Sequence, residues 1–532
     1  MQRRFCLNGP VFLVLVALFI TLSGNYRFFN DVLLVYPATA ANLPFLLSLT
    51  GVVFALLLLV TSLLSLILPL RLAATLMLLW AAVVGHFGDD FGVVVDTEMI
   101  RNTLQTDAGE AGDLLNGAFA LRLLLLGLLP CALVWKIPLK SRSFMVAQLV
   151  NAGMAGAALA MVVVWALPMS AQYSVFLREH KHLRFYINPL AAMVSAGAYA
   201  NQEWFDTPPP AFLRVAKDAS LPPHEGKPEL VIMVVGETAR ADRFALNGYG
   251  RPTNPELEKL DDIVSFSAIS SCGTSTAVSV PCMFSIADKD DFDLKEERHR
   301  ENVLDVLQRV GVSVLWRDNN SSSKGVADRV AYQDFRHPGV NPVCDEECRD
   351  VGMLSGLQDY IDRQKGDILI VLHQMGNHGP AYFKRYPSDF EYFKPACRSV
   401  DLSTCSTDEI NNAYDNAIRY TDYFLAQVIA LLKTNAMAHE TAMLYISDHG
   451  ESLGENGLYL HGAPYFMAPE TQTHVPAIFW RGGALDLDWA ATLRNKDRKN
   501  SHDAVFTSLL EIFEVHSSVV QGRRALFEVE ES

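Results

Sequence analysis

The stretch Leu230-Val-Ile-Met-Val-Val-Gly-Glu-Thr238 decides the fold of the larger part of the chain. Its apolar run ends in a glycine and a carboxylate, which is typical of a buried strand in a parallel sheet. The stretch Met443-Leu-Tyr-Ile-Ser-Asp-His-Gly450 repeats this pattern, with polar side chains directly after an apolar run. Active sites of such sheets gather beyond the carboxyl ends of the strands. We therefore expect Glu237, Asp448 and His449 to share one edge of the sheet.

Other apolar runs of strand length continue the pattern to the C-terminus. They are Val312–Trp316, Ile368–Leu372 and Ala477–Trp480, with helical stretches at Asn302–Val310 and Glu409–Leu432. This alternation predicts an α/β domain over residues 229–532, with a mostly parallel central sheet and helices on both faces.

The first third of the chain has a different composition. Five apolar runs lie at Val11–Ser23, Leu46–Leu68, Leu72–Phe87, Leu121–Trp135 and Phe144–Leu167. Since a helix crosses the hydrocarbon core with about 20 apolar residues, residues 1–170 are predicted to form a membrane domain of five helices. Charged residues make up only 19% of the chain, below the roughly 25% of soluble domains.

Basic residues predict the orientation of this membrane domain. They lie before the first run, between the second and third runs, and between the fourth and fifth, at Arg3, Arg4, Arg71, Lys136, Lys140 and Arg142. The positive-inside rule then places the N-terminus in the cytoplasm and everything after about Met169 on the other side. The alternative is a cleaved signal peptide with Ala38-Thr39-Ala40 as its site, which would leave four spans.

Residues 171–228 join the two parts, and in them aromatic and charged residues alternate. This pattern favours amphipathic helices at the membrane interface, and an ordinary linker is the alternative. Pro208-Pro209-Pro210 and Pro222-Pro223 mark the entry to the α/β domain. The net charge of −15 argues against a broad nucleic-acid-binding surface.

Six of the eight cysteines lie in the α/β domain as three pairs close in sequence. We predict disulfides Cys272–Cys282, Cys344–Cys348 and Cys397–Cys405, formed in an oxidising compartment. Zinc binding is the alternative, but the closest pair, Cys344 and Cys348, lacks a comparable partner pair to complete a tetrahedral site. Cys6 and Cys131 are predicted to be buried, unpaired thiols.

Two elements of the α/β domain suggest chemistry. Two carboxylates and an imidazole at the strand ends suit Zn²⁺, although an Asp–His pair alone is equally typical of a structural hydrogen bond. The segment Ser271–Phe284 places small hydroxyl residues at the start of a helix, where amide groups favour a phosphate. A Thr or Ser there would serve as a metal-activated nucleophile, and an ordinary helix cap is the other interpretation.

Several motifs in one order identify a family. They are Val235-Gly-Glu-Thr238, the Cys272–Cys282 segment, Trp316-Arg-Asp-Asn-Asn320 with Lys324-Gly325, Asn377-His-Gly-Pro380, Ser447-Asp-His-Gly-Glu-Ser-Leu-Gly-Glu-Asn456 and Leu460-His-Gly462. With these motifs the chain resembles the phosphoethanolamine–lipid A transferases, including the mobile colistin-resistance enzymes, of the alkaline phosphatase/sulfatase superfamily. The resemblance covers the five spans, the bridging segment and a periplasmic hydrolase-like domain.

The resemblance implies roles for individual residues. Glu237, Thr276, Asp448 and His449 would bind one catalytic zinc ion, and Thr276, the second Thr of Thr-Ser-Thr, would be the nucleophile. The residues expected to contact the substrate phosphate are Thr274, Asn320, Lys324, His378 and His461. Of these, Lys324, His378 and His461 would also take part in catalysis, and the two histidines would be candidates for an accessory zinc.

The implied reaction transfers phosphoethanolamine from phosphatidylethanolamine to a lipid A phosphate through a covalent Thr276 intermediate. The protein would be a monomeric, multi-pass enzyme of the bacterial inner membrane, in contact with its lipids, and would confer polymyxin and colistin resistance. Alternatives are a transferase acting on lipopolysaccharide core sugar, a phosphoglycerol transferase, or a binding protein on the same fold. A sulfatase needs a Cys or Ser for conversion to formylglycine, and Thr276 argues against one.

Overall fold

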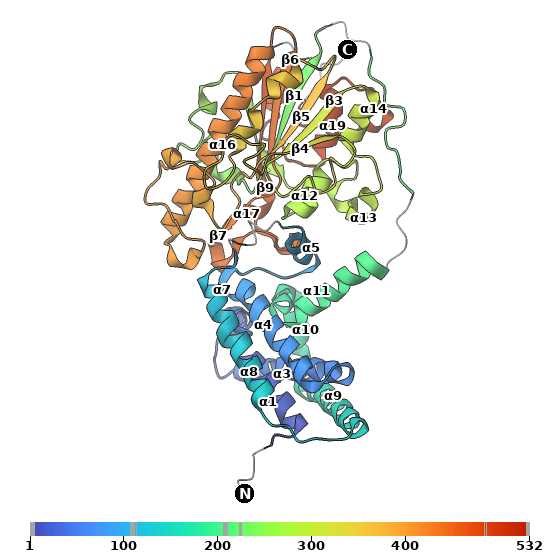
Figure 1. The fold of residues 1–532 in the computed structure, drawn as a ribbon, viewed down its shortest axis with the longest axis vertical. Coiled ribbons are helices and arrows are strands. Elements are labelled where there is room, and N and C mark those ends of the chain that lie inside the picture. The colour runs from blue at the N-terminus through green and yellow to red at the C-terminus, as the bar shows by residue number, and fades with distance from the viewer. Residues whose placement is uncertain are drawn as a thin grey trace. The chain divides into compact units, whose positions relative to one another are not determined.

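The computed structural model describes residues 6–106, 112, 114–205, 211–222, 226–483, 485 and 487–527. The chain forms two compact units, which are drawn in Figure 1: the first comprises residues 1–100 and 114–205, the second residues 101–113 and 206–532. Arg3, Arg4, Pro223 and the Pro208–Pro210 run lie outside the described residues.

The first unit contains the membrane helices. Four helices of the described chain are long and apolar enough to cross a membrane: α3 (Leu43–Ile67), α4 (Leu70–Phe91), the continuous Gly117–Lys136 and Phe144–Glu179, which begins with α9 (Phe144–Ala166). The first predicted span is instead a bent pair, α1 (Gly9–Ser23) and α2 (Tyr26–Val35), with an angle of 57°. The unit therefore has four spans, or five if the bent pair crosses as one.

Two buried asparagines explain how this bend is tolerated. Asn25 Nδ2 donates to the carbonyl of Ile20, and Asn188 Nδ2 donates to the carbonyl of Gly24. Asn25 also donates to the carbonyl of Asn188, and Asn188 to that of Ala81. Since a break in a membrane helix frees backbone carbonyls that lipid cannot satisfy, these amides supply the missing donors. Helices α10 (Ser170–Glu179) and α11 (Leu190–Ala200) complete the first unit.

The second unit is built on one eight-stranded sheet. Its order is β10 (Asn500–Ser501), β2 (Ile263–Ser270), β9 (His474–Gly482), β6 (Glu440–Ser447), β1 (Glu229–Gly236), β5 (Ile368–His373), β3 (Ser313–Asp318) and β4 (Ala331–Asp334). All of these strands are parallel except β9, which pairs antiparallel with β2 and β6. The predicted mostly parallel sheet is therefore confirmed.

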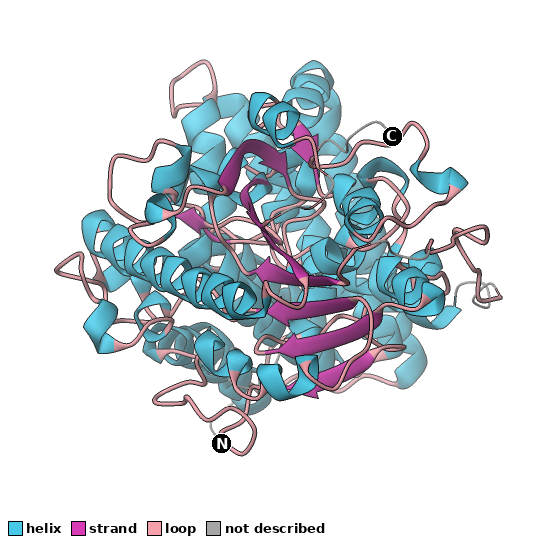
Figure 2. Ribbon diagram, turned by 90° about the horizontal axis from the view of Figure 1, so that it is seen from above, coloured by secondary structure: helices cyan, strands magenta, loops and turns pink. Residues whose placement is uncertain are grey.

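Helices cover both faces of this sheet, as Figure 2 shows. Strand β1 is buried along its whole length, and its side chains alternate between two apolar cores. Val231, Met233 and Val235 face the core that contains α14 (Val303–Val310) and α19 (Ala504–Ile512). Leu230, Ile232 and Val234 face the core of α16 (Thr407–Asn435). Burial on both sides explains why the strand is apolar from Leu230 to Val235.

Capping residues fix the starts of the two predicted helices. Asn302 and Asp305 form a capping box at the start of α14, and Ser406 and Glu409 form one at the start of α16. Each box satisfies amide groups that would otherwise lack a partner in the first turn. The apolar side chains that follow each cap pack on the sheet. The capping residues and the apolar periodicity therefore indicate the same two helices.

A buried carboxyl group at the opposite end of β1 gives a testable pH dependence. Burial and the neighbouring Asp367 carboxyl raise the pKa of Glu229 to about 9, from 4.5. Because the folded state holds this proton more tightly, its stabilising effect is complete below about pH 4.5 and is lost as the pH rises toward 9. We expect the melting temperature of Glu229→Gln to fall less between pH 5.5 and 8.5 than that of the wild type.

The comparison is a calorimetric melt of the full-length protein in detergent. Each kcal/mol of unfolding free energy that the wild type loses corresponds to about 2–4 °C of melting temperature in a large domain. Because glutamine does not ionise, the variant should show little of the fall in melting temperature with pH that the wild type shows. Glu258→Gln, at an exposed position, is the control and should keep the slope of the wild type. Equal slopes in all three proteins would contradict the assigned pKa.

Candidate active site

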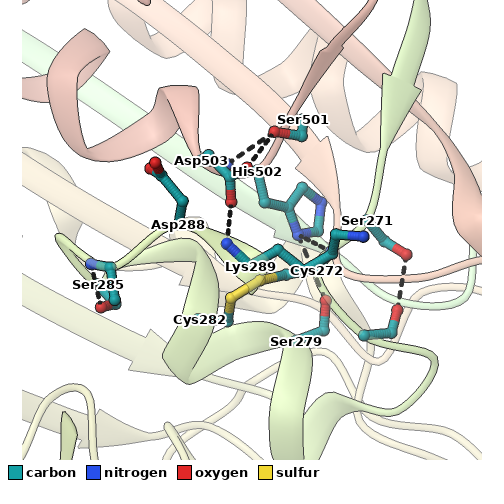
Figure 3. Close-up of a disulfide and its surroundings, with 12 residues drawn as sticks. Ser271, Cys272, Ser279, Cys282, Ser285, Asp288, Lys289, Ser501, His502 and Asp503 are labelled. Atoms are coloured by element: carbon teal, nitrogen blue, oxygen red, sulfur yellow. Dashed lines mark hydrogen bonds between the residues drawn. A yellow bond between two sulfur atoms is a disulfide. The ribbon is translucent and has the colours of Figure 1, made fainter. Parts of the chain in front are cut away.

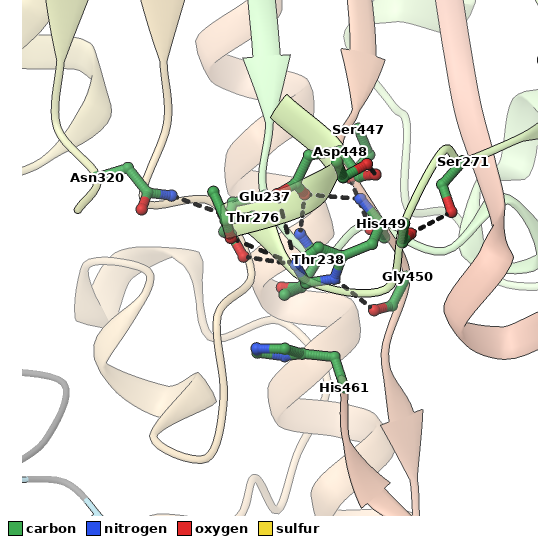
Figure 4. A network of polar contacts seen from close by, with 12 residues as sticks. Glu237, Thr238, Ser271, Thr276, Asn320, Ser447, Asp448, His449, Gly450 and His461 are labelled. Atoms are coloured by element: carbon green, nitrogen blue, oxygen red, sulfur yellow. Dashed lines mark hydrogen bonds and ion pairs between the residues drawn. The ribbon is translucent and has the colours of Figure 1, made fainter. Parts of the chain in front are cut away.

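Strand register brings the two predicted carboxylates together. Strands β1 and β6 are parallel neighbours, and Gly236 pairs with Ser447 at their carboxyl ends. The next residues, Glu237 and Asp448, therefore leave the sheet side by side, and both are fully buried (Figure 4). The backbone N–H of Thr238 donates to Asp448 Oδ1 at 3.2 Å and joins the two strand ends. The edge predicted from the sequence is thus the place where these side chains meet.

Helix α12 (Thr276–Met283) delivers a hydroxyl group to the same place. Thr276 is its first residue, after the N-cap Ser275, whose carbonyl accepts from the amides of Val278 and Ser279. Thr276 Oγ1 donates to Glu237 Oε2 at 3.1 Å and lies 3.4 Å from His449 Nε2. The helix start therefore holds a buried hydroxyl directly between a carboxylate and an imidazole.

The donor atoms of these four residues fit a tetrahedral metal ion. His449 Nε2 is 3.4 Å from Glu237 Oε1 and 3.4 Å from Asp448 Oδ2. Tetrahedral ligands at about 2.0–2.1 Å from zinc lie about 3.3 Å from one another. Glu237, Asp448 and His449 each place one possible ligand atom within 4.8 Å of the others. The spacing thus matches a zinc site built from two carboxylates, an imidazole and a hydroxyl.

Hydrogen bonds around the cluster leave its inner atoms available to a cation. His449 Nδ1 is 2.9 Å from the carbonyl of Gly450, and only a protonated Nδ1 can donate to it. Nε2 therefore carries the lone pair and faces the carboxylates, as in metal-binding histidines. Asp448 Oδ2 receives no hydrogen bond from any residue that the structure describes. Since buried carboxylates need a compensating charge, a divalent cation fits this site.

Two further histidines adjoin the cluster. The ring of His461 lies 4.5 Å from that of His449 and 5.1 Å from that of His378, between centroids. Burial, together with His461 and Arg385, holds the pKa of His378 well below its usual value. His378 is therefore neutral at neutral pH, which suits a hydrogen-bonding or metal-binding role rather than that of an acid.

Glu451 is a functional candidate that the sequence did not reveal. Its Oε2 lies 2.8 Å from His461 Nδ1, and its Oε1 accepts from the hydroxyl of Tyr382 at 2.7 Å. A buried carboxylate on one ring nitrogen fixes the orientation of the imidazole and stabilises its protonated form. Glu451 lies inside the Asp-His-Gly-Glu motif, but nothing in that motif shows which histidine it would contact.

The remaining predicted substrate residues are engaged in other contacts. Asn320 Nδ2 donates to Glu237 Oε2 at 2.7 Å and to the carbonyl of Gln374, so it orients a candidate metal ligand. The hydroxyl of Thr274 donates to the carbonyl of Ala463 at 2.7 Å. Lys324 Nζ donates to the carbonyl and the hydroxyl of Ser321. The structure thus gathers six of the predicted residues with Asn320 at their edge. Thr274 is bonded to Ala463, and Lys324 to Ser321 in its own loop.

The six cysteines of the second unit form the three predicted disulfides, Cys272–Cys282, Cys344–Cys348 and Cys397–Cys405. The first of them encloses Thr276 within a loop closed across helix α12. Cys6 and Cys131 are free, as predicted, and Cys131 is buried, whereas Cys6 is half-buried.

Comparison with known proteins identifies relatives for both units. Residues 229–515 match the sulfatase family model, and residues 53–204 match the model described as phosphoethanolamine transferase EptA/EptB. The chain is 45% identical to phosphatidylethanolamine transferase Mcr-2 of Escherichia coli over 99% of this chain and 98% of the relative. It is 37% identical to phosphoethanolamine transferase EptA of Salmonella typhimurium over 98% of each.

A solved structure matches the whole chain. The integral membrane lipooligosaccharide phosphoethanolamine transferase A (EptA) of Neisseria meningitidis superposes with a TM-score of 0.91 at 32% identity, over 97% of both chains. The match covers the membrane helices and the sulfatase-like domain together. With this agreement in sequence and fold, the chain belongs to the phosphoethanolamine transferase family and is a transferase enzyme.

Proposed function

We propose that the protein transfers phosphoethanolamine from phosphatidylethanolamine to a phosphate of lipid A, through phosphoethanolamine bound covalently to Thr276. The observation that carries this proposal is the convergence of the Thr276 hydroxyl with Glu237, Asp448 and His449. A zinc ion held by these four residues would lower the pKa of the hydroxyl and polarise the phosphate. An accessory ion would have His378 and His461 as its ligands.

In the first half-reaction, Thr276 Oγ1 forms a bond to the phosphorus of the donor while the bond to the diacylglycerol oxygen breaks. Glu237 Oε2, which already accepts a hydrogen bond from this hydroxyl, takes the proton. The departing oxygen needs a proton. When no accessory ion is bound, His461, whose ring is oriented by Glu451, is placed to supply it. Lys324 would compensate the charge of the phosphate if its ammonium group turned from Ser321 toward the substrate.

In the second half-reaction, a lipid A phosphate in its monoanionic form gives its proton to the neutral His461, and its oxygen attacks the same phosphorus. The bond to Thr276 Oγ1 breaks, and this oxygen recovers its proton from Glu237. Phosphoethanolamine has then moved between lipids without net consumption of a proton. The product carries an added amine, which reduces the negative charge of the outer membrane and would weaken the binding of cationic polymyxins such as colistin.

The cellular location follows from the same function. We place the protein in the bacterial inner membrane with its N-terminus in the cytoplasm and the second unit in the periplasm. The basic residues of alternate loops support this orientation, and three disulfides in the second unit suit an oxidising compartment. Both substrates are lipids, which explains why a hydrolase-like domain is joined to membrane helices.

Mass spectrometry of lipid A from cells with and without the protein tests the acceptor. We expect one added phosphoethanolamine group on lipid A, and growth at a higher colistin concentration. If lipid A lacked this group and a core sugar carried it, the acceptor would be the core of lipopolysaccharide rather than lipid A. An added phosphoglycerol group would contradict phosphatidylethanolamine as the donor. Phosphoglycerol and phosphoethanolamine groups differ in mass, so the measurement distinguishes them.

A further inference from the structure

We propose that His502 is a positioning residue for the transfer reaction, which holds the nucleophile helix against the loop of metal ligands. The proposal rests on the proposed function of Thr276, Asp448 and His449. His502 follows β10 at the edge of the sheet, far in sequence from every motif of the site. Its side chain is nevertheless fully buried, and Figure 3 shows it beside Cys272 and Ser279.

His502 joins two segments through its two ring nitrogens. The backbone N–H of Cys272 donates to Nδ1 at 3.2 Å, and Nε2 lies 2.9 Å from the carbonyl of Ser447. Cys272 precedes the nucleophile Thr276 by four residues, and Ser447 directly precedes Asp448. One imidazole therefore connects the loop that leads into α12 with the loop that carries the metal ligands.

The chemistry of these partners fixes the state of the ring. A backbone amide only donates and a carbonyl only accepts, so Nδ1 must hold a lone pair and Nε2 must hold the proton. Burial also lowers the pKa of His502 to about 4, in keeping with a neutral ring. A neutral imidazole thus presents an acceptor and a donor to the two segments from opposite sides of one rigid ring.

A serine of α12 strengthens the same connection. Ser279 lies one turn after Thr276, and its hydroxyl donates to the backbone carbonyl of Asp448. The oxygen of this hydroxyl lies 3.3 Å from His502 Nδ1. The helix is thus held to the ligand loop on both sides of Thr276, through Cys272 before it and Ser279 after it. Since Thr276 must meet the phosphorus in line, this contact determines the rate rather than the binding of substrate.

Three variants of the full-length, zinc-loaded protein test the proposal. His502→Ala removes both contacts, His502→Asn keeps an acceptor for Cys272, and His502→Gln keeps a donor for Ser447. The readout is single-turnover release of diacylglycerol from phosphatidylethanolamine, with bound zinc and the melting temperature measured on the same samples. We expect His502→Ala to lower the maximal rate by about 10²-fold with the KM for the donor unchanged, and the other two variants to recover part of it.

Ser508→Ala is the matched control for a loss of packing. Ser508 is fully buried on α19, a few residues after His502 in the chain, and its hydroxyl bonds to Ala504 and Leu526 rather than to the site. It should lower the melting temperature and leave the rate unchanged. A rate within twofold of the wild type in His502→Ala, or an equal loss of rate in Ser508→Ala, overturns the proposal.

If His502→Ala does not fold, His502→Asn and His502→Gln still test the proposal. Wild-type rates in both variants would overturn it. A wild-type protein that releases no diacylglycerol would instead contradict the proposed function itself.

Discussion

Replacing Thr276 by alanine should lower the release of diacylglycerol and the modification of lipid A by more than about 10³-fold, because the variant has no atom that can bond to phosphorus. Thr276 Oγ1 is the hydroxyl group that lies between Glu237 and His449. Thr276→Ser keeps the hydroxyl but loses the β-methyl group that restricts its rotation, so it should retain measurable activity.

Intact-protein mass spectrometry after incubation with phosphatidylethanolamine checks this directly. Wild-type protein without acceptor should gain the mass of one phosphoethanolamine group at residue 276, and Thr276→Ala should gain none. Thr507→Ala, which removes a fully buried threonine hydroxyl on α19, should gain the group as the wild type does. Covalent modification of Thr276→Ala at another residue would refute the assignment of the nucleophile.

The edge of the sheet that carries the candidate site could be predicted because one physical rule connects sequence and space there. Apolar runs buried on both faces are easily recognised, and the residues after parallel strands share an edge. Glu237, Asp448 and His449 were found in this way. Strand β9 was also visible as an apolar run, but its reversed direction was not, because hydrophobicity does not encode orientation.

The supporting contacts could not be predicted from the sequence. Glu451 reaches His461 across a short antiparallel pair, β7 (Ser452–Leu453) and β8 (Tyr459–Leu460), and two-residue strands have no periodicity. His502 is separated from Ser447 by 55 positions, and its neighbours in sequence are ordinary polar residues. The bend between α1 and α2 likewise depends on Asn188, which is remote in the chain. Such contacts depend on tertiary geometry alone.

Replacing Asp448 by asparagine should abolish metal binding and lower transfer by more than about 10²-fold. The substitution preserves shape, and its carbonyl oxygen can still accept from the amides of Thr238 and His449. It removes the charge at Oδ2, the oxygen that points toward His449 Nε2. The measurements are zinc content by elemental analysis and diacylglycerol release before and after adding zinc. Zinc should restore chelator-treated wild-type protein and leave Asp448→Asn inactive.

In the presence of zinc, Asp448→Asn should be less stable than the wild type, and after removal of the metal it should be more stable. Two buried carboxylates, Glu237 and Asp448, repel each other without a cation, so chelation should lower the melting temperature of the wild type by the lost binding energy. In Asp448→Asn this repulsion is absent, so the chelated variant should melt above the chelated wild type, although it melts below the zinc-loaded wild type. Asp401→Asn, on an exposed turn of the same unit whose side chain bonds to Ser403, is the control and should respond to chelation as the wild type does. If chelation left the wild-type melting temperature unchanged while Asp448→Asn lost activity, the carboxylate would act without a metal, and its part in the reaction would be electrostatic or structural.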